Sequence, residues 1–300
     1  MKKLAYISIG LLGFLAILTA ASYIIGNKRM NTRYNIPVAK DFKIPTDQAS
    51  IDEGLRLATI RQCVECHKYN FEGRVEYDTF YQGRLVIPNL TTGKGGRKLS
   101  AAAMVRAVRN GVGEGGRPLV LMPSREYAQM SDEDVGKIIA YIKSLPPKDN
   151  VLPKRTLGPG AMFVIAFRLA PMIPAEWIDH KKIPPKVMPP APTAEYGRYL
   201  AGGCRYCHGE DLAGQHMMGE PLDKPSATNI TFDKETGIGT WTKAQFKKAV
   251  RYGVRPDGSA LDLIMPWRFL NKLTDLELDA LWAYLKSMPP KKGVNNRKKK

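Results

Sequence analysis

The chain contains two copies of the frame Cys-x-x-Cys-His, at residues 63–67 and 204–208, and these use all four cysteines. Two thiols on one helical turn can form thioether bonds to the two vinyl groups of one porphyrin. The histidine that follows then lies beneath the ring, where a neutral imidazole can ligate iron. The frame is therefore an attachment pattern for c-type haem. The expected attachment residues are Cys63, Cys66, Cys204 and Cys207, and the expected iron ligands are His67 and His208.

Three other chemistries use a Cys-x-x-Cys pair, and each fits this chain less well. A zinc site expects its second pair roughly 15–20 residues further on, whereas the two pairs begin at Cys63 and Cys204. A thioredoxin-like redox pair does not explain a histidine after both pairs. A structural disulfide across two residues is strained. The sequence therefore favours two haem c groups, with their iron, as the cofactors.

The chain also repeats itself at a nearly constant offset. Residues 107–112 read Ala-Val-Arg-Asn-Gly-Val, and residues 249–254 read Ala-Val-Arg-Tyr-Gly-Val. Residues 141–147 read Tyr-Ile-Lys-Ser-Leu-Pro-Pro, and residues 284–290 read Tyr-Leu-Lys-Ser-Met-Pro-Pro. Such collinear matching predicts two homologous domains, each near the small end of the size range for independent folding.

Each copy is expected to be mostly helical. The expected helices cover 50–63, 101–110 and 132–144 in the first copy and 193–204, 243–252 and 275–287 in the second. The cap candidates are Ser100, Ser131, Thr242 with Gln245, and Thr274 with Glu277, and Gly111 and Gly253 follow the second helices. Only residues 84–87 suggest a short strand. A domain of this size with much loop is marginal alone, so a covalently held haem is expected to supply the missing apolar core.

At this level each copy resembles a class I cytochrome c domain. The resemblance lies in the position of the Cys-x-x-Cys-His frame, the turns at 88–90 and 228–230, a Met-Pro pair, and a closing helix that ends in Pro-Pro. Residues 236–241 are similar to a loop in the cytochrome subunits of membrane-bound dehydrogenases. The resemblance implies an all-α fold, with two tandem class I cytochrome c-like domains behind an N-terminal transmembrane helix.

The chain departs from that family in three places. The dehydrogenase subunits usually carry three haems, whereas this chain has two attachment frames. The first copy has Gly-Lys-Gly-Gly at 93–96 in place of the loop at 236–241. The family implies that a backbone carbonyl in the turn orients the axial histidine. Pro88 matches this pattern and Thr228 departs from it, so the resemblance supports this detail more directly at the first haem.

The sixth iron ligand decides between electron transfer and substrate chemistry. Iron closed by methionine transfers electrons, whereas an open position can bind peroxide or oxygen. Met122 and Met265 each precede a proline, which stiffens the loop between the second and last expected helices. Methionine also fills cores, and the competitors are Met104, Met130, Met217 and Met218. Only Met122 and Met265 match between the copies, so they are the expected ligands.

Haem propionates need hydrogen-bond or charge partners, because buried carboxylates are costly when unpaired. The candidates are Asn89 and Asn229 through their amides, Arg109 and Arg251 at matching helix ends, and Trp241 through its indole. For each of them a solvated or packing role fits equally well. His216 is expected at the surface or at a propionate, and no role is assigned to His180.

Residues 4–26 are apolar and uncharged. As a helix at ~1.5 Å per residue they would span about 34 Å, enough for a hydrocarbon core of ~30 Å. A cleaved signal peptide is the alternative, with Thr19–Ala21 as the cleavage region, but the apolar run continues beyond it. We therefore expect a single-pass anchor in the bacterial inner membrane. Attachment of c-type haem outside the cytoplasm, which the resemblance implies, places both haem domains on the periplasmic side.

The formal net charge of +18 does not predict a nucleic-acid partner. The excess positive charge lies at the two chain ends and in the linker, and the two repeats are nearly neutral. Basic ends suit anionic lipid head groups or an acidic partner protein. The basic tail at 297–300 is expected to be solvated.

The expected organisation has six segments. They are an N-terminal membrane anchor at 1–30, a linker at 31–48, a first cytochrome domain at 49–148, a Pro-rich linker at 149–192, a second cytochrome domain at 193–292 and a basic tail at 293–300. The linker contains an apolar stretch at 161–170, which is too short and too charged to span a bilayer. We expect it to cover the join between the domains, with a docking surface for a membrane enzyme or the bilayer as the alternative.

Taken together, these features predict an electron carrier or an electron-transfer subunit without substrate chemistry of its own. It would accept electrons from a membrane dehydrogenase or a quinol-oxidising partner and pass them to a terminal acceptor. A di-haem peroxidase-like enzyme is the alternative from another class, and matched Met-Pro pairs count against its open iron. A cytochrome subunit of a haem-copper oxidase would differ only in its partner. A thiosulfate-oxidising enzyme with a cysteine ligand is excluded, because the chain has no fifth cysteine.

Overall fold

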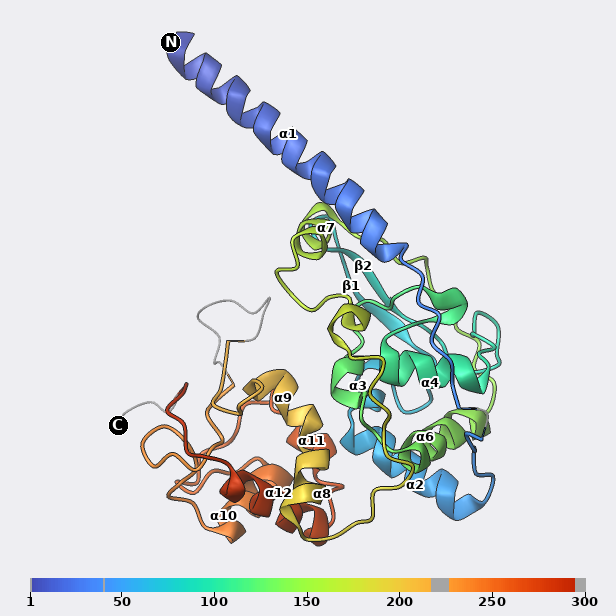
Figure 1. Ribbon diagram of the computed structural model, residues 1–300, viewed down its shortest axis with the longest axis vertical. Coiled ribbons are helices and arrows are strands. Elements are labelled where there is room, and N and C mark those ends of the chain that lie inside the picture. The colour runs from blue at the N-terminus through green and yellow to red at the C-terminus, as the bar shows by residue number, and fades with distance from the viewer. Residues whose placement is uncertain (1, 40, 217–226, 295–300) are drawn as a thin grey trace. The chain divides into compact units, whose positions relative to one another are not determined.

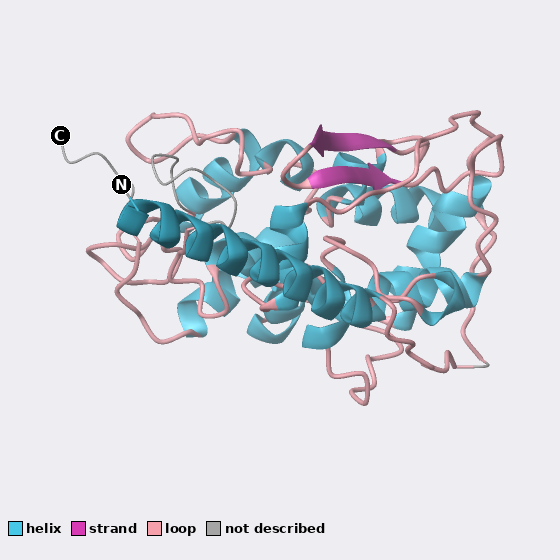
Figure 2. Cartoon of the chain, turned by 90° about the horizontal axis from the view of Figure 1, so that it is seen from above, coloured by secondary structure: helices cyan, strands magenta, loops and turns pink. Residues whose placement is uncertain are grey.

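The computed structural model describes residues 2–39, 41–216 and 227–294. The predicted solvated tail at 297–300 and two of the competing methionines, Met217 and Met218, therefore lie outside the described residues. Helix is the main regular structure, and one antiparallel hairpin is shown in magenta in Figure 2. The mostly helical architecture confirms the predicted fold class, and it begins with the long apolar helix α1 (Lys2–Met30).

The chain forms two compact units that do not follow the two sequence repeats. Unit 1 combines Met1–Lys40, Cys66–Arg125 and Leu145–Lys182, and unit 2 combines Asp41–Glu65, Glu126–Ser144 and Ile183–Lys300. The first and last helices of the first repeat therefore belong to the same compact unit as the whole second repeat.

Unit 2 is built from pairs of crossing helices. Helix α2 (Gln48–Ile60) packs on α6 (Asp132–Ser144), and α8 (Ala194–Leu200) packs on α12 (Asp275–Ser287). Each crossing is close because of a glycine. A Cβ built on Gly54 would lie 2.0 Å from the Lys137 carbonyl oxygen, and one built on Gly197 would lie 2.0 Å from the Ala280 carbonyl oxygen. Only glycine permits such an approach, so the same crossing occurs in both repeats.

The predicted caps set the ends of the later helices. In unit 2, α10 (Lys243–Tyr252) and α12 each begin with a complete capping box, from Thr242 and from Thr274. In unit 1, α4 (Ala101–Asn110) begins at Ser100, and Gly111 ends it with a φ of 63°. Gly253 ends α10 in the same left-handed conformation. These boundaries confirm the sequence predictions for the second and last helices.

The first helices end earlier than predicted. The frame at 63–67 forms its own short helix, α3 (Cys63–His67), because Gln62 has a φ of 61° and interrupts α2. The second frame likewise lies in a separate helix, α9 (Gly202–His208). Four short elements had no clear sequence signal. They are η1 (Glu114–Gly116), α5 (Ser124–Tyr127), η2 (Pro174–Trp177) and α11 (Trp267–Leu270).

Unit 1 contains the hairpin and the attachment of α1. Strands β1 (Arg74–Thr79) and β2 (Gly83–Ile87) pair antiparallel, and β2 includes the predicted strand at 84–87. The predicted apolar linker segment begins with α7 (Pro159–Ala166), which packs on the C-terminal end of α1 (Figure 1). Its buried residues join a cluster with Met30, Val112 and Ile173. The sequence did not predict α1 as the packing partner of this segment.

A partly buried ion pair joins the C-terminal end of α1 to the rest of unit 1. Arg29 Nε donates to Glu176 Oε1 at 2.9 Å, and a second guanidinium nitrogen pairs with the other carboxylate oxygen. Helix α1 is long and apolar enough to cross a membrane, by its length and composition alone. Its exposed apolar surface and its anchored C-terminal end are consistent with a single-pass membrane helix joined to a folded body.

Candidate functional site

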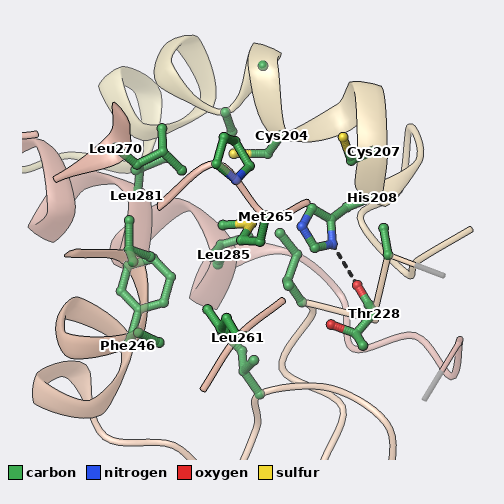
Figure 3. A pocket seen from close by; sticks show the side chains of 18 of the residues that line it. Cys204, Cys207, His208, Thr228, Phe246, Leu261, Met265, Leu270, Leu281 and Leu285 are labelled. Atoms are coloured by element: carbon green, nitrogen blue, oxygen red, sulfur yellow. Dashed lines mark hydrogen bonds between the residues drawn. The ribbon is translucent and has the colours of Figure 1, made fainter. Parts of the chain in front are cut away.

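Unit 2 contains a cavity of about 400 Å³ that brings together four predicted site residues of the second repeat. Cys204, Cys207, His208 and Met265 all line it, and Figure 3 shows their side chains around the same space. The volume lies within the usual range for a small-molecule or cofactor pocket. The cavity therefore combines two attachment thiols with one imidazole and one thioether.

The imidazole of His208 is held in one orientation. Its Nδ1 donates a hydrogen bond to the Thr228 carbonyl oxygen at 2.6 Å, which is the dashed line in Figure 3. A proton on Nδ1 leaves Nε2 available as a ligand. Burial lowers the pKa of His208, with the Thr228 carbonyl acting in the opposite direction. The ring is therefore neutral, which is the form that binds iron.

Met265 is presented by a tight loop. Its backbone N–H donates to the Asp262 carbonyl oxygen at 3.1 Å, and its own carbonyl accepts from Trp267 N–H at 2.8 Å. Pro266 lies between these bonds and donates none, because proline has no amide hydrogen. The loop thus fixes the backbone on both sides of the methionine, as the Met-Pro pair predicted.

The rest of the cavity fits a porphyrin. Apolar side chains provide most of its lining, including Leu200 of α8, Phe246 of α10, and Leu281 and Leu285 of α12. Burial raises the pKa of Cys207 to about 11, and nearby Cys204 and Glu65 act in the same direction. The described residues contain no group of three or more metal-binding side chains of the zinc type.

Part of the cavity wall comes from the first repeat, which the sequence did not reveal. Ile60, Arg61 and Gln62, at the end of α2, line the same space as Cys204 and His208. Arg255 also lines it, and its positive side chain two residues after the helix stop at Gly253 was the available sequence signal. No periodicity or spacing rule predicts that the end of α2 contributes to the second site.

At the first site the histidine is also buried. Cys63, Cys66 and His67 share helix α3. Burial lowers the pKa of His67 to about 4, with the Pro88 backbone carbonyl acting in the opposite direction. The ring stacks on Phe71 with centroids 5.5 Å apart. Its Nδ1 is buried. Among the described residues, no acceptor meets the distance and angle of a hydrogen bond to this atom.

Met122 lies in a loop of the same design as Met265. Its carbonyl accepts from Ser124 N–H at 2.8 Å, across Pro123. Ser124 Oγ donates to the Ala107 carbonyl oxygen at 2.7 Å and ties the loop to α4. Leu121, just before the methionine, has a φ of 63° and donates to the Met172 carbonyl. The two Met-Pro loops therefore share a backbone arrangement that the matched sequence predicted.

The two asparagines that were predicted as propionate partners hold loops together in the structure. Asn229 Nδ2 donates to Thr236 Oγ1 at 2.8 Å and to the Lys291 carbonyl oxygen at 2.6 Å, so both of its amide hydrogens are used. Asn89 Nδ2 donates to the Lys148 carbonyl oxygen at 2.7 Å in the same manner. In each repeat this bond fastens the turn to the segment after the last helix.

The other three propionate candidates lie in different surroundings. Arg251 is engaged elsewhere, because its guanidinium donates to Asp275 Oδ1 and to the Leu273 carbonyl oxygen, both at 3.0 Å. Trp241 lines the second cavity. Arg109 is buried at 7% exposure on α4. Trp241 and Arg109 therefore remain candidates, and Arg251 has a structural role at the start of α12. His180 contacts Asn110 at 3.2 Å and packs on Tyr34.

Comparison with known proteins identifies the two sequence repeats as two domains of one kind. The family model described as cytochrome c oxidase, cbb3-type, subunit III matches the chain twice, over residues 49–142 and 190–285. Each match contains one Cys-x-x-Cys-His frame. Each also contains the Met-Pro loop, which comes later in the chain, after α4 or α10.

Individual relatives resemble the chain over shorter stretches. The fructose dehydrogenase cytochrome subunit of Gluconobacter japonicus is 41% identical over 101 residues, which cover 31% of this chain and 21% of the relative. The cytochrome c subunit of a quinone alcohol dehydrogenase from Gluconacetobacter polyoxogenes is 40% identical over 94 residues, covering 29% of this chain and 20% of the relative. A diheme cytochrome c-type protein of Cereibacter sphaeroides is 32% identical over 101 residues, covering 31% and 34%.

The chain thus spans about a fifth of the length of the two dehydrogenase subunits and about a third of the diheme cytochrome. The two family matches together cover more than half of the chain, and each contains one haem-attachment frame and one Met-Pro pair. The chain therefore belongs to the family of cbb3-type cytochrome c oxidase subunit III, whose c-type cytochrome domain it contains twice, with one haem c for each.

Proposed function

We propose that this chain transfers electrons, one at a time, through two haem c groups that are each ligated by histidine and methionine. The second cavity is the observation that carries this proposal, because its thiols, neutral imidazole and thioether converge on one space of about 400 Å³. Histidine and methionine together close both axial positions of iron. Such a site changes the charge of its iron without binding a substrate.

The residues around each iron perform three tasks. Cys63, Cys66, Cys204 and Cys207 would hold the porphyrins covalently, and His67 and His208 would bind iron through Nε2. Met122 and Met265 would supply soft sulfur ligands, which favour reduced iron and raise the potential. The apolar wall around the second site limits access of water and so limits reorganisation during transfer.

The partners follow from the relatives and the family. The relatives include cytochrome subunits of a fructose and an alcohol dehydrogenase, so a membrane dehydrogenase or a quinol-oxidising enzyme is the proposed electron donor. The family description names an oxidase, and a terminal oxidase is a proposed acceptor. Neither transfer requires acid–base residues.

Helix α1 is proposed to hold the chain in the bacterial inner membrane, with both haem domains on the periplasmic side. Its last turns pack on α7, and Arg29 is paired with Glu176. Lipid is therefore the proposed partner of its exposed apolar surface. Membrane extraction followed by N-terminal sequencing tests this placement, and a mature chain that begins after Ala21 in the soluble fraction would contradict it.

The decisive test of function is a spectrum and a titration of the purified holoprotein. Produced in a host that matures c-type cytochromes, it should contain two covalent haems per chain and show the far-red absorption band of sulfur–iron bonding when oxidised. It should also accept two electrons without binding peroxide. A colourless protein, one haem per chain, or a high-spin iron with peroxidase activity would overturn the proposal.

A further inference from the structure

Unit 2 has a buried arginine at the C-terminal end of α2 to which the proposed function assigns no role. Arg61 is the C-cap residue of α2 and precedes Cys63 by two positions in the chain. It is 4% exposed, and it lines the cavity of the second site. Gln62, which also lines this cavity, is bonded directly to Cys63. The second cavity wall therefore continues along the backbone into the attachment residue of the first haem.

The guanidinium of Arg61 is only partly satisfied. Nη1 donates to the Leu200 carbonyl oxygen at 3.1 Å and to the Tyr199 carbonyl oxygen at 3.4 Å. The guanidinium carbon lies 5.0 Å from the centroid of the Tyr199 ring. Nε and Nη2 are buried and make no hydrogen bond within the described residues. A buried charge with two unsatisfied donors is costly unless a further group meets it.

The other charged side chains that line the cavity with Arg61 are Arg255 and Asp262. Tyr199 Oη donates to Asp134 Oδ2 at 2.5 Å, and this carboxylate, although Arg61 acts on it, does not line the cavity. Arg61 and Arg205 both favour the ionised form of Cys204, and Glu126 opposes them. Arg61 is thus the largest positive influence on Cys204, whereas Glu65 and Glu126 act in the opposite sense on Cys207.

On the basis of the electron-transfer function above, we propose that Arg61 is a positioning residue that orders the two haems in potential. Its fixed positive charge faces the second haem and makes reduction of that iron more favourable than reduction of the first. Both irons have the same expected ligands, so the ligands alone do not order them. In the favoured step the iron held by His67 loses one electron and is oxidised, and the iron held by His208 gains it and is reduced.

The physical reason is Coulombic. Reduction lowers the charge of the iron site by one, and a nearby buried cation stabilises the less positive state. Water and salt screen a buried charge far less than an exposed one. The same mechanism applies to a propionate near the cation, because neutralising the propionate also removes negative charge that opposes reduction. The inference thus concerns the charge of Arg61 and does not depend on which haem edge it meets.

The test is a spectroelectrochemical titration of the full-length holoprotein carrying Arg61→Gln. The expected result is about a tenfold loss in the equilibrium constant for reducing the second haem, equivalent to 59 mV for one electron, with a smaller change at the first. A Met265→His variant identifies which titration step belongs to the second haem. Arg198→Gln is the matched control, because it removes an exposed arginine of α8 beside Tyr199 and should leave both steps unchanged.

Two further measurements keep the inference testable if Arg61→Gln matures poorly. Arg61→Lys keeps the charge and should retain the order of the two haems, and a shift as large as that of the glutamine variant would overturn the inference. In the natural protein, the separation of the two steps should persist in 1 M salt, and its collapse would also overturn it. Two haems with intact sulfur–iron bands but no shift in Arg61→Gln would reject the role of Arg61 and leave the proposed function standing.

Discussion

The two haem-binding repeats have the same helix crossing but different surroundings for the axial histidine. In the second repeat, His208 Nδ1 donates to the carbonyl of Thr228 at 2.6 Å. In the first repeat, the Pro88 carbonyl acts on the pKa of His67 in the same sense, but His67 Nδ1 is buried without a well-formed hydrogen bond among the described residues. Because the carbonyl belongs to the backbone, the path of the turn matters more than the identity of its side chain.

The segments between histidine and turn also differ. The first repeat carries the hairpin of β1 and β2 at this place. In the second, Gln215 and Ala227 form an isolated antiparallel bridge. The hairpin edge reaches the linker, since Gly83 approaches Thr156 and Gly158. The same repeat unit therefore accepts different insertions after its histidine, as long as both ends return to the turn.

The crossing of the first and last helices is the part that the repeats share most closely. Gly54 meets Lys137 and Tyr141, and Gly197 meets Ala280 and Tyr284 in the same arrangement. The comparison shows that the two repeats share the geometry of the helix crossing, whereas the groups around each haem differ between them. The two haems can thus acquire different potentials on one scaffold.

Loss of either haem should have the largest effect, and the two losses should differ. At ~24 cal/mol per Å³, an empty cavity of about 400 Å³ would cost roughly 10 kcal/mol, comparable with a typical total stability of 5–15 kcal/mol. We therefore expect Cys204→Ala with Cys207→Ala to unfold much of unit 2. Circular dichroism and haem counting measure this.

Cys63→Ala with Cys66→Ala is the matched comparison. It should leave one haem per chain, with the second cavity filled. Equal loss of helix in both double variants would contradict the prediction that unit 2 depends mainly on the second haem.

The next largest effect is expected at an ion pair between the two sets of helices within unit 2. Arg56 donates to both carboxylate oxygens of Glu277 at 2.8 Å, and Glu277 is 2% exposed. Arg56→Gln would leave this carboxylate largely unpaired, at a cost of about 3 kcal/mol in unfolding free energy. Urea unfolding of the holoprotein measures it, with Arg198→Gln as the exposed control. A loss no greater than that of the control would contradict this prediction.

The pH dependence of the same pair has a definite sign. Burial acts to raise the pKa of Glu277, but the hydrogen bonds from Arg56 and the Thr274 backbone outweigh it and hold the pKa below the ordinary 4.5. Its contribution to stability is therefore present above pH 4.5 and is lost as the pH falls through the lower folded value. Arg56→Gln should weaken this acid dependence, and acid titrations of both proteins compare their slopes.

A smaller and symmetrical effect is expected at the helix crossings. Gly197→Ala and Gly54→Ala each force a Cβ against a backbone carbonyl, which should cost about 1–3 kcal/mol. Gly13→Ala is the control, because nothing lies within 4 Å of a Cβ built there. Thermal unfolding compares the three. If only one of the two crossings were sensitive, the repeats would not share the crossing geometry described above.

The smallest effect is expected when Thr228 is replaced by proline, so that the turn at 228–230 begins with proline like the turn at 88–90. Thr228→Pro should leave the second haem spectrum unchanged, because His208 uses the backbone carbonyl of residue 228 and not its side chain. Ala227 pairs with Gln215 in an extended bridge, which is the conformation that a following proline requires. Loss of the sulfur–iron band in this variant would show that the threonine itself positions the histidine.

Much of the architecture could be predicted from local rules. Ser100, Thr242 and Thr274 occur as helix caps, and Gly111 and Gly253 end their helices in the left-handed conformation. Each of these features is decided by residues within one helical turn. The Met-Pro loops were predictable for the same reason, since proline restricts the backbone next to the methionine.

Other features depend on residues far apart in the sequence. The hydrogen bonds of Asn229 to Thr236 and to the Lys291 carbonyl were not predicted, because Lys291 lies far from Asn229 in the sequence. The break between α2 and α3 depends on Gln62 adopting a left-handed φ, which glutamine rarely does without tertiary support. The packing of α7 on α1 joins two apolar segments that had no pairing signal.

The sequence by itself determined the chemistry, because covalent haem attachment needs only two thiols and a histidine at fixed spacing along one short helix. It also determined the helices, because caps and prolines act locally. Only the tertiary structure decided which groups surround the second haem. The end of α2 reaches that cavity through packing between residues separated by much of the chain, and such packing leaves no periodic trace in the sequence.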